Sequence, residues 1–137
     1  MARIITVANE KGGVGKTTAC RNLGAALNDK GFKVLLVDLN HQVNLTLSVG
    51  IEDTDSIKTT ICDGMNAVFD GTAVPSGLIL THNGINIIPA NKNLVLTKVN
   101  LACKAGGDGI LRELLFPLRQ VYDYILIDTG PTMADSQ

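Results

Sequence analysis

A glycine-rich segment that follows a short apolar run constrains this chain more than any other feature. Residues 4–8 read Ile-Ile-Thr-Val-Ala, and the segment beyond them contains Lys11, Gly12, Gly13, Val14, Gly15, Lys16, Thr17 and Thr18. Because glycine has no Cβ, successive backbone N–H groups of such a segment can converge on an anion. A strand that enters this loop and continues into a helix predicts a site for nucleotide phosphates, since the helix N-terminus adds its positive dipole end.

The side chains of this segment suit a triphosphate that carries magnesium. Lys16 supplies a positive charge for the outer phosphates, and the Thr17 hydroxyl is a ligand for hydrated Mg²⁺. The alternative interpretation is structural, because a lysine in a glycine-rich turn is usually a solvated charge and Thr17-Thr18 could be a plain helix cap. Eight matching residues in a strand–loop–helix context favour phosphate binding.

The segment departs from the common phosphate-loop pattern at its start. That pattern has a glycine five residues before Gly15, where this chain has Glu10, and an additional lysine, Lys11, follows. In this form the segment resembles the deviant Walker A motif of the ParA/Soj/MinD family of ATPases. The resemblance implies ATP as the nucleotide, and it implies that Lys11 reaches across a dimer interface to the nucleotide of the partner subunit.

The order of the expected elements indicates an α/β fold in which helices sandwich a mainly parallel sheet. Strands are expected at residues 3–8, 34–38, 78–81, 85–89 and 124–128, with a tight hairpin at Asn83-Gly84. Helices are expected at residues 17–30, 59–69, 91–101 and 110–121, the last of them interrupted at Pro117. In the first helix, Leu23, Ala26 and Leu27 share one face, and residues 39–56 are expected to form a polar loop. With the family resemblance, this layout predicts a P-loop NTPase of the deviant Walker A (SIMIBI-like) type.

Two of the expected strands end in an aspartate at the same edge of the sheet as the glycine-rich segment. Asp38 ends the run Val-Leu-Leu-Val-Asp, and Asp128 ends the run Tyr-Ile-Leu-Ile-Asp. Carboxylates in such positions can hold the water shell of Mg²⁺ and orient an attacking water. An isolated aspartate at a strand end is often only a cap of a turn or helix, but beside a phosphate-binding segment the nucleotide role is favoured.

Both aspartates begin segments that resemble motifs of the same family. Residues 128–131, Asp-Thr-Gly-Pro, resemble its Walker B aspartate and switch II, and residues 38–46 resemble its switch I pattern D-x-D-P-Q-x-N-L-T. The resemblance implies three ligands for Mg²⁺, namely Thr17, Asp38 and Asp128. It also implies that the catalytic residues are Lys11, Lys16, Asp38 and Asn40.

The switch I segment differs from the family pattern at its second aspartate, which is Asn40 here, and at the next position, where His41 replaces proline. In the family, that aspartate helps to activate the hydrolytic water. Asparagine can hold a water by hydrogen bonds but cannot accept its proton. The loss of one such group is expected to slow hydrolysis roughly 10²–10⁴-fold and to leave Mg·ATP binding intact. The sequence therefore leaves open whether the chain is an effective ATP hydrolase.

Composition and charge exclude several classes of protein. Hydrophobic residues make up 45% of the 137 residues, which excludes disorder as the overall state. A formal net charge of −1 gives no sign of the excess positive charge that attracts DNA or an acidic membrane. No apolar stretch approaches the ~18 residues of a membrane span. The cysteines, Cys20, Cys62 and Cys103, lack metal-ligand spacing and predict reduced thiols in a cytoplasmic protein.

The resemblance spans essentially the whole chain, yet family members continue through further strands and helices. Residues 1–137 are therefore expected to be a single, incomplete (truncated) domain, with the strand at residues 3–8 on an open sheet edge. The expected function is that of an ATP-binding, ParA-like ATPase of plasmid or chromosome partitioning, which dimerises when ATP binds. A ParB-like partner and non-specific DNA are implied by the resemblance alone, and no membrane partner is expected.

Three alternatives remain open from the sequence. The first is a nucleotide-binding switch with impaired hydrolysis, because of Asn40 and of the expected truncation. The second is an inactive fragment, and the third is a MinD-like regulator of the division site. The segments around residues 85–91 and 111–124 favour the ParA/Soj branch over the MinD branch.

Overall fold

The computed structural model describes residues 1–8, 14–40, 42–91 and 109–129. In this part of the chain one sheet contains five strands in the order β1-β5-β2-β4-β3. The strands β1, β5, β2 and β4 are parallel, and β3 pairs with β4 in the antiparallel direction. Their bounds are Arg3–Ala8 for β1, Val34–Leu39 for β2, Leu80–His82 for β3, Ile85–Ile88 for β4 and Tyr124–Thr129 for β5. The predicted mainly parallel α/β sheet is confirmed.

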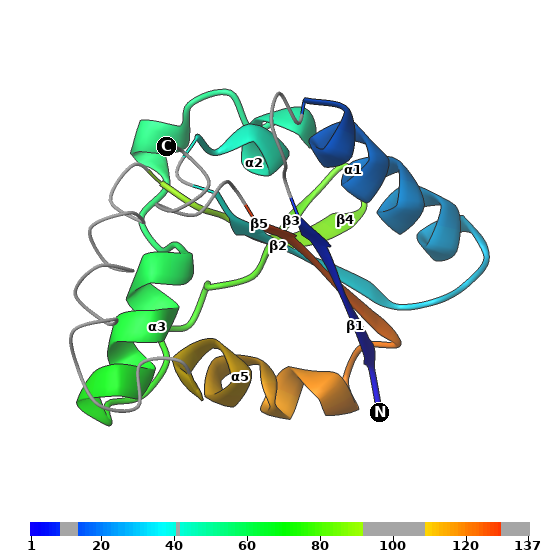
Figure 1. Cartoon of the computed structure of the whole chain (residues 1–137). Coiled ribbons are helices and arrows are strands. Elements are labelled where there is room, and N and C mark those ends of the chain that lie inside the picture. Colours follow the sequence, from blue (N-terminus) through cyan, green and yellow to red (C-terminus); the bar gives the residue numbers. More distant parts are fainter. Residues whose placement is uncertain (9–13, 41, 92–108, 130–137) are drawn as a thin grey trace.

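The helices lie on both faces of this sheet (Figure 1). Helices α1 and α2 cover one face, and α3 and α5 cover the other, as Figure 1 shows. Their bounds are Val14–Asp29 for α1, Asn44–Ser48 for α2, Ile61–Asp70 for α3 and Ile110–Leu115 for α5, with 3-10 turns at Thr54–Ser56 and Pro117–Gln120. None of the helices in the described ranges is long and apolar enough to cross a membrane.

The central strand β2 is buried along its whole length and supplies both hydrophobic cores. Because successive side chains of a strand point to opposite faces, Leu35 and Val37 pack toward α3 and α5, whereas Val34 and Leu36 pack toward α1 and α2. The same alternation places Asp38 on the face that α1 and α2 cover. A continuous run of branched apolar residues is what a strand with helices on both faces requires.

Local sequence patterns explain where most elements begin and end. The hairpin turn at Asn83 and Gly84 has φ angles of 52° and 77°, as the predicted Asn-Gly turn requires. Helix α3 begins with a capping box between Thr60 and Asp63 and ends at Gly71 in the left-handed region. The predicted interruption at Pro117 is confirmed, since α5 ends at Leu115 and a 3-10 turn follows. The helix expected at residues 91–101 falls almost entirely on residues outside the described ranges.

One local prediction is wrong, and a second is only partly confirmed. The expected loop at residues 39–56 contains the short helix α2, whose start is fixed by contacts with Asp38 rather than by its own sequence. The predicted face of α1 is only partly the buried one, because Leu27 packs against the core, whereas Leu23 is 40% exposed and the fully buried residue is Cys20. Gly24, which has no side chain, faces the sheet, and a Cβ there would lie 2.9 Å from Leu36 Cδ2. Helix α1 thus approaches the sheet through its small residues.

Strand β1 occupies an edge of the described sheet, with β5 as its paired neighbour. Its apolar side chains Ile4, Ile5 and Val7 are only half-buried, although an Ile- and Val-rich strand is expected to be covered on both faces. The edge position accounts for this exposure, because one side of the strand has no neighbouring strand in the described residues. Within the described ranges, β1 thus lies at the sheet edge where it is expected from the sequence.

The capping box of α3 leads to a test of local stability. The Thr60 side chain is fully buried, and its hydroxyl oxygen accepts a hydrogen bond from the Cys62 backbone N–H at 3.3 Å. Replacing Thr60 with alanine is expected to lower the free energy of unfolding by about 1 kcal/mol, whereas Thr60→Ser keeps the capping oxygen and most of the stability. Urea denaturation of the three proteins measures the difference. An equal loss in both variants would show that the hydroxyl does not stabilise the helix.

Candidate functional site

The candidate site lies where β1, β5 and β2 end, next to the first turn of α1. In the sheet register, Asp128 lies opposite Val7 on one side and opposite Asp38 on the other. Residues in register on neighbouring strands point to the same face, so both aspartates lie under the α1 layer. Both are fully buried. The structure therefore brings together the two carboxylates that the sequence predicts at this edge.

The carboxylate of Asp38 is held by three hydrogen bonds. Its Oδ2 accepts from the Thr46 backbone N–H at 2.9 Å and from the Thr46 hydroxyl at 2.6 Å. Its Oδ1 accepts from the Asn40 backbone N–H at 3.1 Å. Asp38 thus also has the capping role that a strand-end aspartate often has, because it organises the turn after β2 and the start of α2. This capping fixes the orientation of the carboxylate at the sheet edge.

Burial and neighbouring charge make the ionised form of Asp38 unfavourable. Burial, with a smaller contribution from the charge of Asp128, outweighs the hydrogen bonds from Thr46 and Asn40, which favour the ionised form, and the pKa of Asp38 is raised to about 6. Cys20 of α1 feels the same carboxylates, since burial, Asp128 and Asp38 together raise the pKa of its thiol to about 12. The Cys20 thiol of the site is therefore neutral, and the two carboxylates lie close together. A bound cation would stabilise their ionised forms.

The raised pKa of Asp38 predicts how stability depends on pH. Between about pH 4 and pH 6 the folded chain binds more protons than the unfolded chain, so this residue lowers the free energy of unfolding as pH rises. The expected contribution is on the order of 2 kcal/mol. Urea denaturation without divalent cations, compared with the Asp38→Asn variant, isolates it. From about pH 4 to pH 6, the free energy of unfolding is expected to fall less in the variant than in the parent. If it falls equally in both proteins, the raised pKa of Asp38 is contradicted.

Asn40 follows β2 and is also fully buried. Its side-chain Oδ1 accepts from the Gln42 backbone N–H at 2.9 Å. Because a backbone N–H can only donate, this bond fixes the orientation of the amide and turns Nδ2 the other way. Nδ2 is buried and has no hydrogen-bond partner among the residues that the structure describes. At this position the chain therefore offers an N–H donor, where the family pattern has a carboxylate.

The turn between Asn40 and α2 contains a strained residue that the sequence did not indicate. Val43 has φ 53° and ψ 28°, a left-handed conformation that costs a β-branched residue about 1–3 kcal/mol. Its side chain is buried in the core on the α3 side, and its N–H donates to the Asn40 carbonyl oxygen at 2.9 Å. Burial of the Val43 side chain and this hydrogen bond offset the strain.

The predicted phosphate-binding residues are only partly within the described ranges. Helix α1 begins at Val14, three residues earlier than expected, so its first turn includes Gly15, Lys16 and Thr17. Thr18 follows in the same helix and is exposed. The residues Lys11, Gly12 and Gly13 lie outside the described ranges, and their roles remain predictions. Because α1 follows β1 after only a short link, its N-terminus lies at the same sheet edge as the two aspartates.

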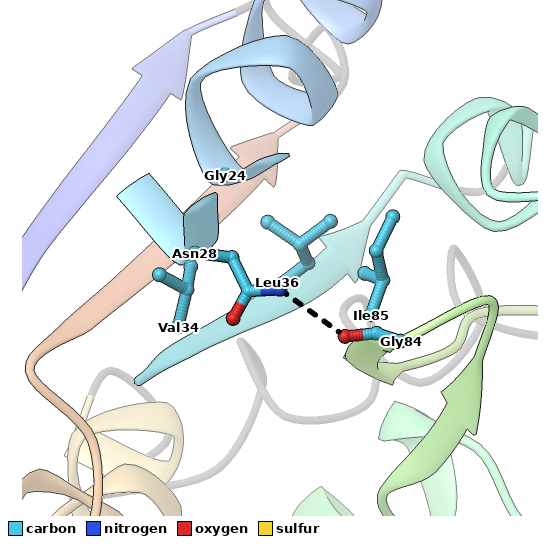
Figure 2. A pocket seen from close by; sticks show the side chains of 6 residues that line it. All are labelled: Gly24, Asn28, Val34, Leu36, Gly84 and Ile85. Atoms are coloured by element: carbon cyan, nitrogen blue, oxygen red, sulfur yellow. Dashed lines mark hydrogen bonds between the residues drawn. The ribbon is translucent and has the colours of Figure 1, made fainter. Parts of the chain in front are cut away.

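A small cavity lies at the opposite end of β2 and is not part of this site (Figure 2). It is lined by α1, the start of β2 and the β3–β4 hairpin, through Gly24, Asn28, Val34, Leu36, Gly84 and Ile85. Asn28 Nδ2 donates across it to the Gly84 carbonyl oxygen at 3.4 Å, the dashed line in Figure 2. Its volume of about 10 Å³ is enough for one water at most. The cavity is a packing seam rather than a ligand pocket.

Comparison with known proteins identifies the family. The AAA_31 family model, described as an AAA domain, matches residues 2–135, and the chain therefore belongs to this family. The chain is 37% identical over 133 residues to the sporulation initiation inhibitor protein Soj of Bacillus subtilis, covering 97% of this chain and 51% of Soj. It is 35% identical over 133 residues to the chromosome partitioning protein ParA of Caulobacter vibrioides, covering 96% of this chain and 49% of ParA. The predicted ParA/Soj resemblance is confirmed.

Solved structures confirm the fold class. The cobyrinic acid a,c-diamide synthase from Mycobacterium smegmatis, solved with a bound ATP analog and magnesium, superposes with a TM-score of 0.84 at 35% sequence identity. The match covers 96% of this chain and 52% of the synthase chain. This chain spans about half the length of the curated relatives it matches.

Proposed function

We propose that this chain is the nucleotide-binding portion of a ParA-like ATPase that binds ATP with Mg²⁺ at the common end of β1, β5 and β2. The observation that carries the proposal is the pair of buried aspartates, Asp38 and Asp128, in register on neighbouring strands beside the first turn of α1. Two carboxylates and a helix N-terminus at one sheet edge suit a dication and a polyphosphate together. The bound ATP analog and magnesium of the structural neighbour support the same ligands.

The residues at this edge fit the proposed ligands. Burial disfavours the charge on Asp38, and Asp128 opposes it further, so the pair gains stability when a divalent cation binds. Bound Mg²⁺ supplies positive charge against the carboxylates and phosphates. In this arrangement Asp38, Asp128 and the Thr17 hydroxyl hold the hydrated ion. The backbone of residues 12–18 and the Lys16 ammonium group hold the phosphates.

The biological role in this proposal is plasmid or chromosome partitioning. Its support is the family membership and the similarity to relatives named for chromosome partitioning. ATP-dependent dimerisation through Lys11, a ParB-like partner and non-specific DNA belong to the same proposal and rest on the family resemblance. The chain spans about half the length of those relatives. Dimerisation, the ParB-like partner and DNA binding are therefore proposed for a protein of the relatives' full length.

One observation favours a second candidate, a nucleotide-dependent switch that binds ATP and hardly hydrolyses it. The buried Asn40 side chain presents an N–H donor and no carboxylate. A donor can hold a phosphate oxygen or the oxygen of a water, but it cannot take a proton from that water. Binding and hydrolysis are thus separable properties of this site.

The proposal is tested by measuring how Mg²⁺ changes ATP affinity. Isothermal titration of ATP is expected to show binding roughly tenfold or more tighter with Mg²⁺ than with EDTA, because the ion links the phosphates to the carboxylates. The Asp128→Asn variant is expected to lose most of this difference. Asp29→Asn is the matched control, because Asp29 is exposed at the far end of α1. A difference that survives in Asp128→Asn would rule out the proposed metal ligand.

A further inference from the structure

Thr46 of α2 joins three elements at the candidate site although it lies in the segment expected to be a loop. The residue is fully buried. Its backbone N–H and its hydroxyl both donate to Asp38 Oδ2, at 2.9 and 2.6 Å. Its hydroxyl oxygen also accepts from the Ala90 backbone N–H at 3.2 Å, just after β4. One side chain thus connects the end of β2, helix α2 and the segment that follows β4.

The direction of these hydrogen bonds follows from the donors present. The Ala90 N–H can only donate, so it occupies a lone pair of the Thr46 hydroxyl oxygen. The single hydroxyl proton is then directed to the Asp38 carboxylate, and the 2.6 Å separation is typical of a charge-assisted bond. Ala90 therefore orients the hydroxyl, and the hydroxyl orients the carboxylate.

The two oxygens of Asp38 are consequently not equivalent. Oδ2 accepts two hydrogen bonds from Thr46, whereas Oδ1 accepts one, from the Asn40 N–H. A carboxylate oxygen has two lone-pair directions, so Oδ2 is filled and Oδ1 retains capacity for another donor or a metal-bound water. Asp38 therefore offers a ligand one defined oxygen.

We propose that Thr46 is a positioning residue for magnesium binding, because its hydroxyl holds Asp38 Oδ2 and so presents Oδ1 toward the ion. This inference rests on the proposed function, since it assigns the group that prepares one of the proposed Mg²⁺ ligands. It adds to the proposed function that a residue of α2, itself held by the backbone after β4, fixes the orientation of the Asp38 carboxylate. In this proposal Thr46 acts through Asp38, the carboxylate to which its hydroxyl donates.

Two substitutions separate positioning from simple packing. Thr46→Val keeps the shape of the side chain and removes both hydroxyl hydrogen bonds. Thr46→Ser removes a methyl group and keeps the hydroxyl. If Thr46 only fills space, serine is the more harmful change, and neither variant alters the response to Mg²⁺. If Thr46 positions Asp38, valine is the more harmful change and its effect appears specifically when Mg²⁺ is present.

The experiment measures ATP affinity of the 137-residue chain and its variants by calorimetry, in Mg²⁺ and in EDTA, together with the thermal midpoint of each protein. The ratio of the affinity in Mg²⁺ to the affinity in EDTA is expected to fall roughly tenfold in Thr46→Val and to remain close to the parent value in Thr46→Ser. The affinity in EDTA is expected to change little in either variant. If the valine variant does not fold, Thr46→Ala, which also removes the hydroxyl, takes its place, and the same fall in the affinity ratio is expected.

The outcomes distinguish this inference from the proposed function. An unchanged affinity ratio in a folded Thr46→Val or Thr46→Ala protein overturns the positioning role while ATP binding by the parent still supports the proposed function. Equal losses in Mg²⁺ and in EDTA also overturn it, because they indicate a general disturbance of the site. A folded parent chain that binds no ATP overturns the proposed function and the role of Thr46 with it.

Discussion

Replacing Asn40 with aspartate is expected to accelerate ATP hydrolysis by roughly 10²–10⁴-fold, the usual contribution of a positioned acid–base group. Asn40 is fully buried, its Oδ1 accepts from Gln42, and its remaining polar atom is a donor. An aspartate can keep the Gln42 hydrogen bond through one oxygen and offer the other oxygen to the attacking water. The substitution therefore adds an acceptor at the position where the family pattern has one.

Single-turnover hydrolysis at saturating Mg·ATP measures this effect without a contribution from product release. Saturating ligand also limits the cost of adding a third carboxylate beside Asp38 and Asp128, because Mg²⁺ and ATP stabilise the folded chain. Asn40→Ala is the control, since it removes the amide and adds no carboxylate, and it is expected to be no faster than the parent. An aspartate variant that hydrolyses ATP at the parent rate would show that Asn40 does not limit the reaction.

Replacing Lys16 with alanine is expected to weaken nucleotide binding by roughly 100-fold or more, effectively abolishing it at ordinary concentrations. Lys16 lies in the first turn of α1, beside the strand ends that carry Asp38 and Asp128. Without the Lys16 ammonium group, the outer phosphates lose one positive charge that offsets their repulsion from the two buried carboxylates. Removal of one partner of a desolvated charge pair typically costs several kcal/mol, which is the basis of this magnitude.

Lys11→Ala is the matched control for Lys16→Ala, because both substitutions remove a lysine from the same glycine-rich segment. Lys11 is expected to act on the nucleotide of a second subunit, so its removal should leave binding by the monomer unchanged and weaken ATP-dependent dimerisation. Titration calorimetry measures the first property, and sedimentation velocity with and without Mg·ATP measures the second. Equal losses of monomer binding in the two variants would remove the proposed difference between the lysines.

The sequence predicts the architecture because the decisive patterns are local. The buried runs that end in Asp38 and Asp128 identify parallel strands, and the carboxyl ends of parallel strands meet at one edge of a sheet. The Asn83-Gly84 turn and the interruption at Pro117 follow from backbone preferences of those residues. Such features require no knowledge of distant contacts, so the candidate carboxylates could be placed before the fold was known.

The rest of the site depends on contacts between residues that are distant along the chain. Helix α2 is five residues long and lacks a local cap, so its presence follows from the bond between Asp38 and the Thr46 N–H. The left-handed Val43 has no sequence signal, because glycine or asparagine is the usual residue in that conformation. The burial of α1 through Gly24 depends on Leu36 of the neighbouring strand. Tertiary contacts decide each of these features.

The binding heat of ATP with Mg²⁺ tests most directly whether this sheet edge holds a magnesium-bound triphosphate. Calorimetry on the folded chain is predicted to show saturable binding of one nucleotide per chain, with ATP favoured over GTP. The absence of heat with both nucleotides, over a range of temperatures at which the protein is folded, would contradict the account.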